Sequence, residues 1–414
     1  MRPERRRRGD LVAAAVLVVL GVVAATVLWS TGEVAGTTSA PAAAAAPEPP
    51  PAAGVPAGFT EAWRAPSAAT PLPVVSPHAV VTADGSTVTG HDPLTGTTTW
   101  TYSRDEPLCT AAAGFPGADQ GVGRVLALYG DGPHWCSELT ALRPDTGARA
   151  AAANPDTRPG ARLLAAGSSV VGTGSDYLEV LRSDLVKTLE YGLVSAPAQP
   201  ERQPRAGCRY GSTALVSGRL GVIERCPGEF GDRLTTISPD GPDGADKPAV
   251  EFSVALPGVG ATLVALTTEL AAVALPGPPR LLVFDRQGAQ VEVIGLDVPE
   301  ADLAVDPPGG VAAVRVGGQR VYWWTGSRTV ALDETTLRPV WTAADALGPA
   351  LPHGGGLLLP VPDGLAELDP VTGATLRTLR VPRADPLAPV HLDSVGEVVV
   401  EQRGTELVAL RPSG

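Results

Sequence analysis

Apolar and polar positions alternate over short segments along most of the chain, and turn residues separate these segments. One unit recurs: an apolar segment, a Gly-containing turn, a second segment ending in a small-apolar-Asp or Arg triplet, a Thr-Gly turn, and a third segment ending in Trp. The clearest copies are residues 80–100, 320–341 and 357–377. Alternation with many β-branched residues predicts β-strands, and the 3.6-residue apolar period of helical repeats is not found.

Eight copies of this unit can be placed along the chain, about 46 residues apart, which is the size of a four-stranded propeller blade. We therefore predict an all-β fold, an eight-bladed β-propeller, with seven blades as the alternative because the third and fourth units are weakly marked. The last position of the triplet in the eight units is Asp92, Arg143, Arg182, Ser238, Asp285, Asp333, Asp369 and Arg411.

The two ends of the repeat region complement each other. The last unit stops after its triplet at Arg411, and residues 59–66 form an isolated strand-like segment that contains Trp63. If this segment supplies the fourth strand of the last blade, it joins the first blade to the last and removes an exposed edge.

The amino-terminal region has a different composition. Residues 11–29 carry no charge and are almost all Leu, Val and Ala, a length that suits a transmembrane helix. We expect a single-pass membrane anchor with a basic cytoplasmic tail at residues 1–10, an Ala/Pro-rich linker at 30–57 and the β-propeller domain at 58–412, outside the cytoplasm. A cleaved signal peptide is the alternative, and a lipoprotein anchor is excluded because no Cys follows the apolar run.

Charge supports this division of the chain. The net charge is −12. The first ten residues hold five arginines and two acids, so the other 404 residues carry −15. An acidic domain without clustered Lys or Arg argues against a nucleic-acid partner.

The repeat resembles the tryptophan-docking motif of the pyrroloquinoline-quinone-like (quinoprotein-type) β-propeller family. In "GHDPLTGTTTW" the matching residues are Asp92, Gly96 and Trp100, and "ALDETTLRPVW" matches at Asp333 and Trp341. The layout is also similar to that of the propeller lipoproteins of the Bam outer-membrane assembly machine, although an apolar span stands here in place of a lipidated Cys. The resemblance implies a structural role for Trp63, Asp92, Gly96, Trp100, Gly147, Asp333, Trp341, Asp369 and Gly373.

The four cysteines fall as one pair in each of the two longest intervals between units. In an exported chain this predicts two disulfides within blades, Cys109 to Cys136 and Cys208 to Cys226, with metal binding as the alternative. The quinone-dependent members of the family carry adjacent cysteines and an amide ligand for Ca²⁺, whereas this chain has no Cys-Cys dipeptide and Asn154 is its one Asn. We therefore expect no cofactor, no metal site and no catalytic residue.

These observations favour a non-enzymatic protein-interaction scaffold in the bacterial cell envelope, whose partner is an envelope protein or a wall polymer. The alternative is a small-molecule sensor or an enzyme that uses the propeller channel, with Asp302 and Asp306 near its mouth.

Overall fold

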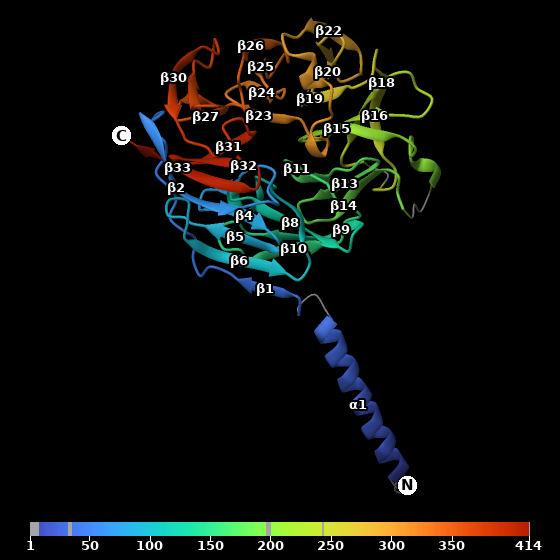
Figure 1. Cartoon of the computed structure of the whole chain (residues 1–414). Helices are drawn as coiled ribbons and strands as arrows, with labels where there is room; N and C mark the ends of the chain where they lie inside the picture. The colour runs from blue at the N-terminus through green and yellow to red at the C-terminus, as the bar shows by residue number, and fades with distance from the viewer. Residues whose placement is uncertain (1–7, 32–34, 196–199, 242–243, 414) are drawn as a thin grey trace.

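Each predicted unit folds into one antiparallel sheet, and the sheets form an eight-bladed β-propeller (Figure 1). The computed structural model describes residues 8–31, 35–195, 200–241 and 244–413. The first strands of successive blades contact one another around the ring, from β3 through to β31 and back to β3, so they line the central channel. The eight-blade prediction is confirmed.

From the channel outwards, the strands of each blade follow in chain order, except that the outer strand of blade eight comes from the beginning of the domain. Blade one consists of β3 (Val74–Ser76), β4 (Ala79–Asp84), β5 (Thr87–His91) and β6 (Thr98–Arg104), and blade two of β7 (Leu108–Gly114), β8 (Arg124–Asp131), β9 (Trp135–Leu142) and β10 (Arg149–Ala153). Blade three consists of β11 (Leu163–Ala166), β12 (Ser169–Gly172), β13 (Tyr177–Arg182) and β14 (Lys187–Gly192), and blade four of β15 (Arg209–Val216), β16 (Arg219–Arg225), β17 (Arg233–Ser238) and β18 (Ala249–Ala255). Blade five consists of β19 (Thr262–Leu266), β20 (Ala271–Leu275), β21 (Arg280–Phe284) and β22 (Gln290–Gly295), and blade six of β23 (Ala313–Gly317), β24 (Arg320–Trp324), β25 (Thr329–Asp333) and β26 (Pro339–Ala343). Blade seven consists of β27 (Leu351–His353), β28 (Gly356–Val361), β29 (Gly364–Leu368) and β30 (Thr375–Arg380), and blade eight of β31 (Val390–Val395), β32 (Val398–Arg403), β33 (Glu406–Ser413) and β2 (Gly58–Pro66). Short 3-10 helices are η1 (Ala118–Gly121), η2 (Pro200–Arg202), η3 (Glu300–Leu303) and η4 (Pro308–Gly310).

The order of strands gives the ring two distinct faces. Blade-to-blade connections and the turns between second and third strands lie on one side, which we call the connection face. The turns between first and second strands and between third and fourth strands lie on the other side, the hairpin face. Within the described residues, the apolar core divides into eight clusters, each shared by two neighbouring blades. Packing between blades therefore holds the ring together.

The ring closes through the amino-terminal strand. β2 pairs antiparallel with β33, from Gly58 opposite Ser413 to Pro66 opposite Glu406. The last blade thus takes its outer strand from the beginning of the domain, as the sequence predicts, and main-chain hydrogen bonds tie the last blade to the segment that leads into the first.

The expected linker is in large part a component of the propeller. β1 (Thr37–Ala40) adds a fifth strand to the outer edge of blade one, beside β6 (Figure 1). Residues 41–57, which we call the strap, then cross the hairpin face: Pro50 accepts a hydrogen bond from the Glu397 N–H at 2.8 Å, and Ala46 one from His78 at 3.0 Å. The predicted Ala/Pro-rich linker over residues 30–57 therefore does not stand apart from the domain from Thr37 onwards, because strand pairing and hydrogen bonds to the hairpin face hold that part on the propeller.

One apolar helix, α1 (Arg8–Thr31), precedes this region. Its segment Gly9–Val27 has a mean hydropathy of 2.5, is long enough to cross a membrane and has none of its surface buried in the protein. The predicted span at residues 11–29 lies within this helix, whereas residues 1–7 of the expected basic tail lie outside the described residues.

Candidate functional site

The repeat tryptophans join each blade to the next. Trp63 of blade eight donates its indole N–H to the Pro93 carbonyl of blade one at 3.0 Å, and Trp100 of blade one donates to Pro144 of blade two at 2.9 Å. Trp341 of blade six donates in the same way to Pro370 of blade seven at 3.2 Å. These side chains lie between blades and so serve the fold.

The turn that receives each indole needs glycine. Gly96, Gly147 and Gly373 have φ of 72°, 71° and 72°, a left-handed conformation that glycine adopts without steric cost. A Cβ on Gly147 would lie 2.5 Å from Cδ2 of Trp100, so the indole occupies the space that a side chain would fill.

The triplet aspartates hold these turns. Asp92 accepts hydrogen bonds from two backbone N–H groups at 2.9 Å, and Asp333 and Asp369 accept equivalent pairs between 2.8 and 3.1 Å. The bonds from the Thr336 and Thr372 turns lower the pKa of Asp333 and Asp369. All three carboxylates are therefore engaged in turn structure.

Both predicted disulfides are formed, Cys109 to Cys136 in blade two and Cys208 to Cys226 in blade four. Cys226 follows the end of β16 and opens the connection-face turn of residues 226–232. The second bridge therefore ties this turn to the chain that enters β15.

The segment between β22 and β23, residues 296–312, lies on the connection face beside the mouth of the channel, and we call it the plug loop. Asp306 forms two hydrogen bonds with the Arg225 guanidinium of blade four, at 2.5 and 2.6 Å. Further along, the Gly309 carbonyl accepts a hydrogen bond from the Thr173 hydroxyl of blade three at 3.2 Å. The loop thus leaves blade five and contacts both blade four and blade three.

The two carboxylates considered for channel chemistry both have partners within the protein. Asp306 is paired with Arg225, and Asp302 accepts from the Thr325 hydroxyl at 2.5 Å and from the Ser327 N–H at 3.1 Å. They therefore anchor the plug loop in this arrangement.

Buried carboxylates elsewhere in the described residues also sit in ion pairs. Glu224 pairs with Arg205 at 2.8 Å, and Glu401 pairs with Arg383 at 2.7 Å. Glu179 lies 3.1 Å from the Lys187 ammonium, and burial raises the pKa of this carboxyl. No group of three or more metal-ligating side chains suited to an ion occurs among the residues described.

A hollow of about 430 Å³ remains beside the plug loop at the connection-face mouth of the channel. Its wall is mostly apolar or main chain, with Arg162 and His391 as its titratable side chains. Burial lowers the pKa of His391 to about 4, and the nearby arginines Arg162 and Arg315 act in the same direction, so this imidazole is neutral at pH 7.

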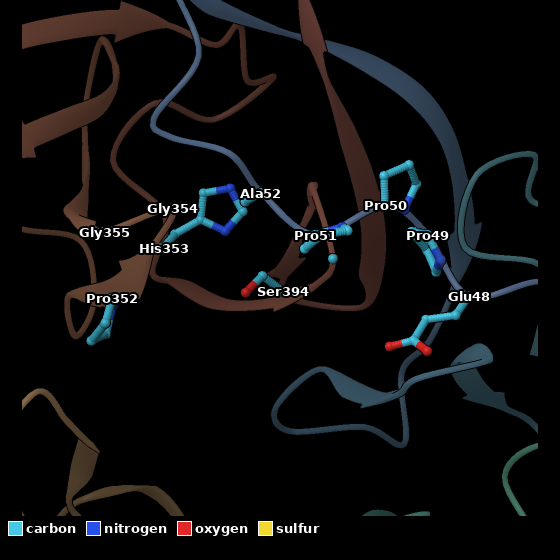
Figure 2. A pocket seen from close by; sticks show the side chains of 11 residues that line it. Glu48, Pro49, Pro50, Pro51, Ala52, Pro352, His353, Gly354, Gly355 and Ser394 are labelled. Carbon is cyan, nitrogen blue, oxygen red and sulfur yellow. The ribbon is translucent and has the colours of Figure 1, made fainter.

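The strap borders a second hollow, of about 730 Å³, on the hairpin face. Figure 2 shows the strap prolines passing Ser394 and His353. The His353 ring is buried, its Nε2 has no hydrogen-bond partner among the described residues, and burial lowers its pKa. This hollow is widely open and results from the way the strap lies on blades seven and eight.

Several large exposed apolar side chains lie on the connection face, in its loops or, for Trp135, at the start of β9: Leu72, Trp135, Leu193, Phe230, Val259, Val305 and Leu387. Phe230 is fully exposed and Val259 is 63% exposed. Their two loops are joined because the Asp232 N–H donates to the Gly258 carbonyl at 2.8 Å. We call these two exposed side chains, on loops joined by that hydrogen bond and near the Cys208–Cys226 bridge in sequence, the apolar patch.

Sequence reasoning missed two kinds of residue. Phe252 of blade four takes the place of a docking tryptophan, since a Cβ on Gly288 of blade five would lie 2.7 Å from its ring. Leu185 and Leu337 adopt the left-handed conformation that glycine has in the other turns, with φ of 63° and 56°. Phe252 follows Ser238 by 14 residues, whereas Trp100 and Trp341 follow Asp92 and Asp333 by eight, so the longer turn of blade four hid the docking position. Neither Leu carries a sequence signal.

Comparison with known proteins supports the fold. No family model matches the chain, and no curated protein matches it. Among solved structures, BamB from Moraxella catarrhalis aligns with a TM-score of 0.52 at 14% identity, covering 85% of this chain and 99% of that one. The dihydro-heme d1 dehydrogenase NirN in complex with DHE gives 0.53 at 14%, covering 84% and 78%, and the designed protein Ika8 gives 0.54 at 12%, covering 84% and 98%. At these identities the likeness shows the propeller fold alone.

Proposed function

We propose that this chain is a membrane-anchored β-propeller that acts outside the cytoplasm as a non-enzymatic interaction scaffold of the bacterial cell envelope. The observation that carries the proposal is the apolar patch of Phe230 and Val259, an exposed aromatic side chain on a loop that a disulfide and main-chain hydrogen bonds hold in place. Aromatic side chains on loops that are already ordered bind partners at little entropic cost, and such residues dominate the energy of many interfaces.

The membrane anchor fixes where this patch acts. Between the end of α1 at Thr31 and the Gly36 carbonyl, which accepts a hydrogen bond from the Asp105 N–H, only residues 32–35 intervene. The five residue-to-residue steps from Thr31 to Gly36 span at most about 18 Å when the chain is fully extended. Gly36 lies at the connection-face end of β6, so an anchored α1 holds blade one near the membrane on the face that carries the patch.

The basic residues before α1 favour a cytoplasmic amino terminus and an external propeller. Alkaline carbonate extraction of membranes, followed by protease treatment of spheroplasts, tests this arrangement. The chain should stay in the membrane pellet and its propeller should be digested from outside. A soluble mature chain that begins after α1 would show a cleaved signal peptide and overturn the anchor.

The interaction role is tested with Phe230→Ala and with Val371→Ala as a matched control. Val371 is also apolar and is 68% exposed, but it lies in a turn of the hairpin face. After crosslinking in intact cells, an envelope partner should be recovered with the wild-type chain and with Val371→Ala, and at least tenfold less with Phe230→Ala. Equal recovery of the partner with all three chains would show that the patch is not part of the interface.

A further inference from the structure

The hollow at the connection-face mouth contains a cation that the protein does not neutralise. Arg162 precedes β11 and is the one charged side chain in the wall of this hollow. Among the described residues, no carboxylate oxygen lies within 4.0 Å of its guanidinium, and no acceptor forms a hydrogen bond with it. Arg162 is partly buried, so its charge loses part of its hydration without gaining a partner, and this burial lowers the pKa of the guanidinium.

Contacts to the backbone N–H and the aliphatic side-chain carbons of Arg162 hold its guanidinium in place. The Arg162 N–H donates to the Thr173 hydroxyl at 2.9 Å, and the same hydroxyl donates to the Gly309 carbonyl of the plug loop. A Cβ on Gly309 would lie 2.4 Å from Cγ of Arg162. The aliphatic stem therefore packs directly on the glycine backbone, and the plug loop forms the wall that positions the cation.

The other cation near the hollow is already neutralised. Arg315 lies 3.1 Å from the Asp393 carboxylate and also donates to the Leu392 carbonyl. His391, which lines the hollow, is neutral at pH 7 because its pKa is low, and its ring nitrogens have no hydrogen-bond partner among the described residues. The Thr70, Thr110 and Gln402 side chains also line the hollow but already form hydrogen bonds within the protein. The site thus offers one positive charge and one neutral imidazole to a ligand, and no carboxylate lies in its wall.

The rest of the wall and the volume of the hollow indicate the size and polarity of the ligand. The wall includes six alanine and proline side chains, which give it apolar surface: Ala68, Ala69, Pro71, Ala161, Ala388 and Pro389. A volume of about 430 Å³ lies in the usual range of small-molecule pockets. A single guanidinium matches a carboxylate in charge and in its two-pronged geometry.

We propose that this hollow binds a small organic molecule that has one carboxylate group and an apolar body, with the carboxylate on Arg162 and an N–H of His391 as a second donor. This site is separate from the patch of Phe230 and Val259, and the inference does not rest on the interaction role.

Binding is measured on the full chain in detergent micelles with phenylacetate and hexanoate, and with the neutral amide of each acid as a matched probe. Both acids should raise the melting temperature in proportion to the logarithm of their concentration, and the amides should not. Arg162→Gln should weaken binding at least tenfold. Arg380→Gln, which removes an exposed charge from the outer strand of blade seven, should leave it unchanged.

The imidazole of His391 gives a second readout that does not depend on stability. A bound carboxylate near the ring favours its protonated form, so the pKa of His391 measured by NMR should rise when phenylacetate is present. It should also rise in Arg162→Gln without ligand, because a neighbouring positive charge is lost. The proposal is overturned if neither acid at 10 mM, a concentration on the order of weak small-ligand dissociation constants, changes the melting temperature or the His391 signals. It is equally overturned if the amides act like the acids, or if Arg162→Gln binds like the wild type.

Discussion

Replacing Gly147 and Trp100 singly and together measures how strongly one blade is fixed to the next. Trp100 is 1% exposed and packs on the backbone of Gly147 in the neighbouring blade. Trp100→Ala should cost about 3–5 kcal/mol of unfolding free energy, because it removes a large buried aromatic side chain and leaves a cavity.

Gly147→Ala should cost about 2–5 kcal/mol in the wild type. About 1–2 kcal/mol comes from placing a Cβ in the left-handed conformation at φ 71°, and about 1–3 kcal/mol from its clash with the indole. In the Trp100→Ala background the clash disappears, so only the conformational part should remain. Gly85→Ala is the matched control, since Gly85 has φ of 58° but nothing within 4 Å of the position of a Cβ.

Guanidinium denaturation of the full chain in detergent micelles, followed by far-UV circular dichroism, gives the unfolding free energies of the wild type, the three single variants and the two double variants. A coupling of about 1–3 kcal/mol between positions 100 and 147, and none between 100 and 85, is expected. If Gly147→Ala costs the same in both backgrounds within about 0.5 kcal/mol, the docking of Trp100 on this turn is refuted.

Three further predictions concern the loops, the channel and the strap. Replacing Cys208 and Cys226 by Ser opens a bridge across 18 residues and should lower the unfolding free energy by about 3 kcal/mol in the same denaturation assay; an unchanged midpoint would contradict this. The pKa of His391 is lowered from 6.5 to about 4 by burial and by two arginines. Between pH 6.5 and 4, His391 is therefore protonated in the unfolded chain and neutral in the folded chain. Stability should therefore fall by up to about 3 kcal/mol between pH 6.5 and 4, and His391→Gln should flatten this part of the pH profile. Arg377 donates to the carbonyls of Val55 and Pro56 at 3.0 Å, so Arg377→Ala should speed proteolysis within the strap several-fold, and an unchanged cleavage rate would oppose its docking.

The repeat is recognisable in the sequence because each blade uses the same local chemistry. Asp92, Asp333 and Asp369 bond to N–H groups two and three residues further on, and the docking tryptophans follow at a fixed spacing. Such contacts depend on short sequence distances. The two weakly marked units also correspond to blades, since Arg182 and Ser238 each end the third strand of a blade.

The strap and the hollow could not be predicted in the same way. Pro50 and Ala46 contribute backbone carbonyls to the hairpin face, and a carbonyl is the same in every residue type, so composition indicated only an extended spacer. Arg162 meets Gly309 across 147 positions of sequence. Nothing local to either residue marks this contact, and only the ring brings them together.

The connection face is proposed to meet an envelope partner through the patch of Phe230 and Val259. Photo-crosslinking from a benzophenone amino acid placed at position 230 in living cells tests this most directly, with the same amino acid at position 371 as control. We predict a discrete crosslinked species from position 230 and none from position 371. Equal crosslinking from both positions, or none from position 230, would contradict the proposed interaction role.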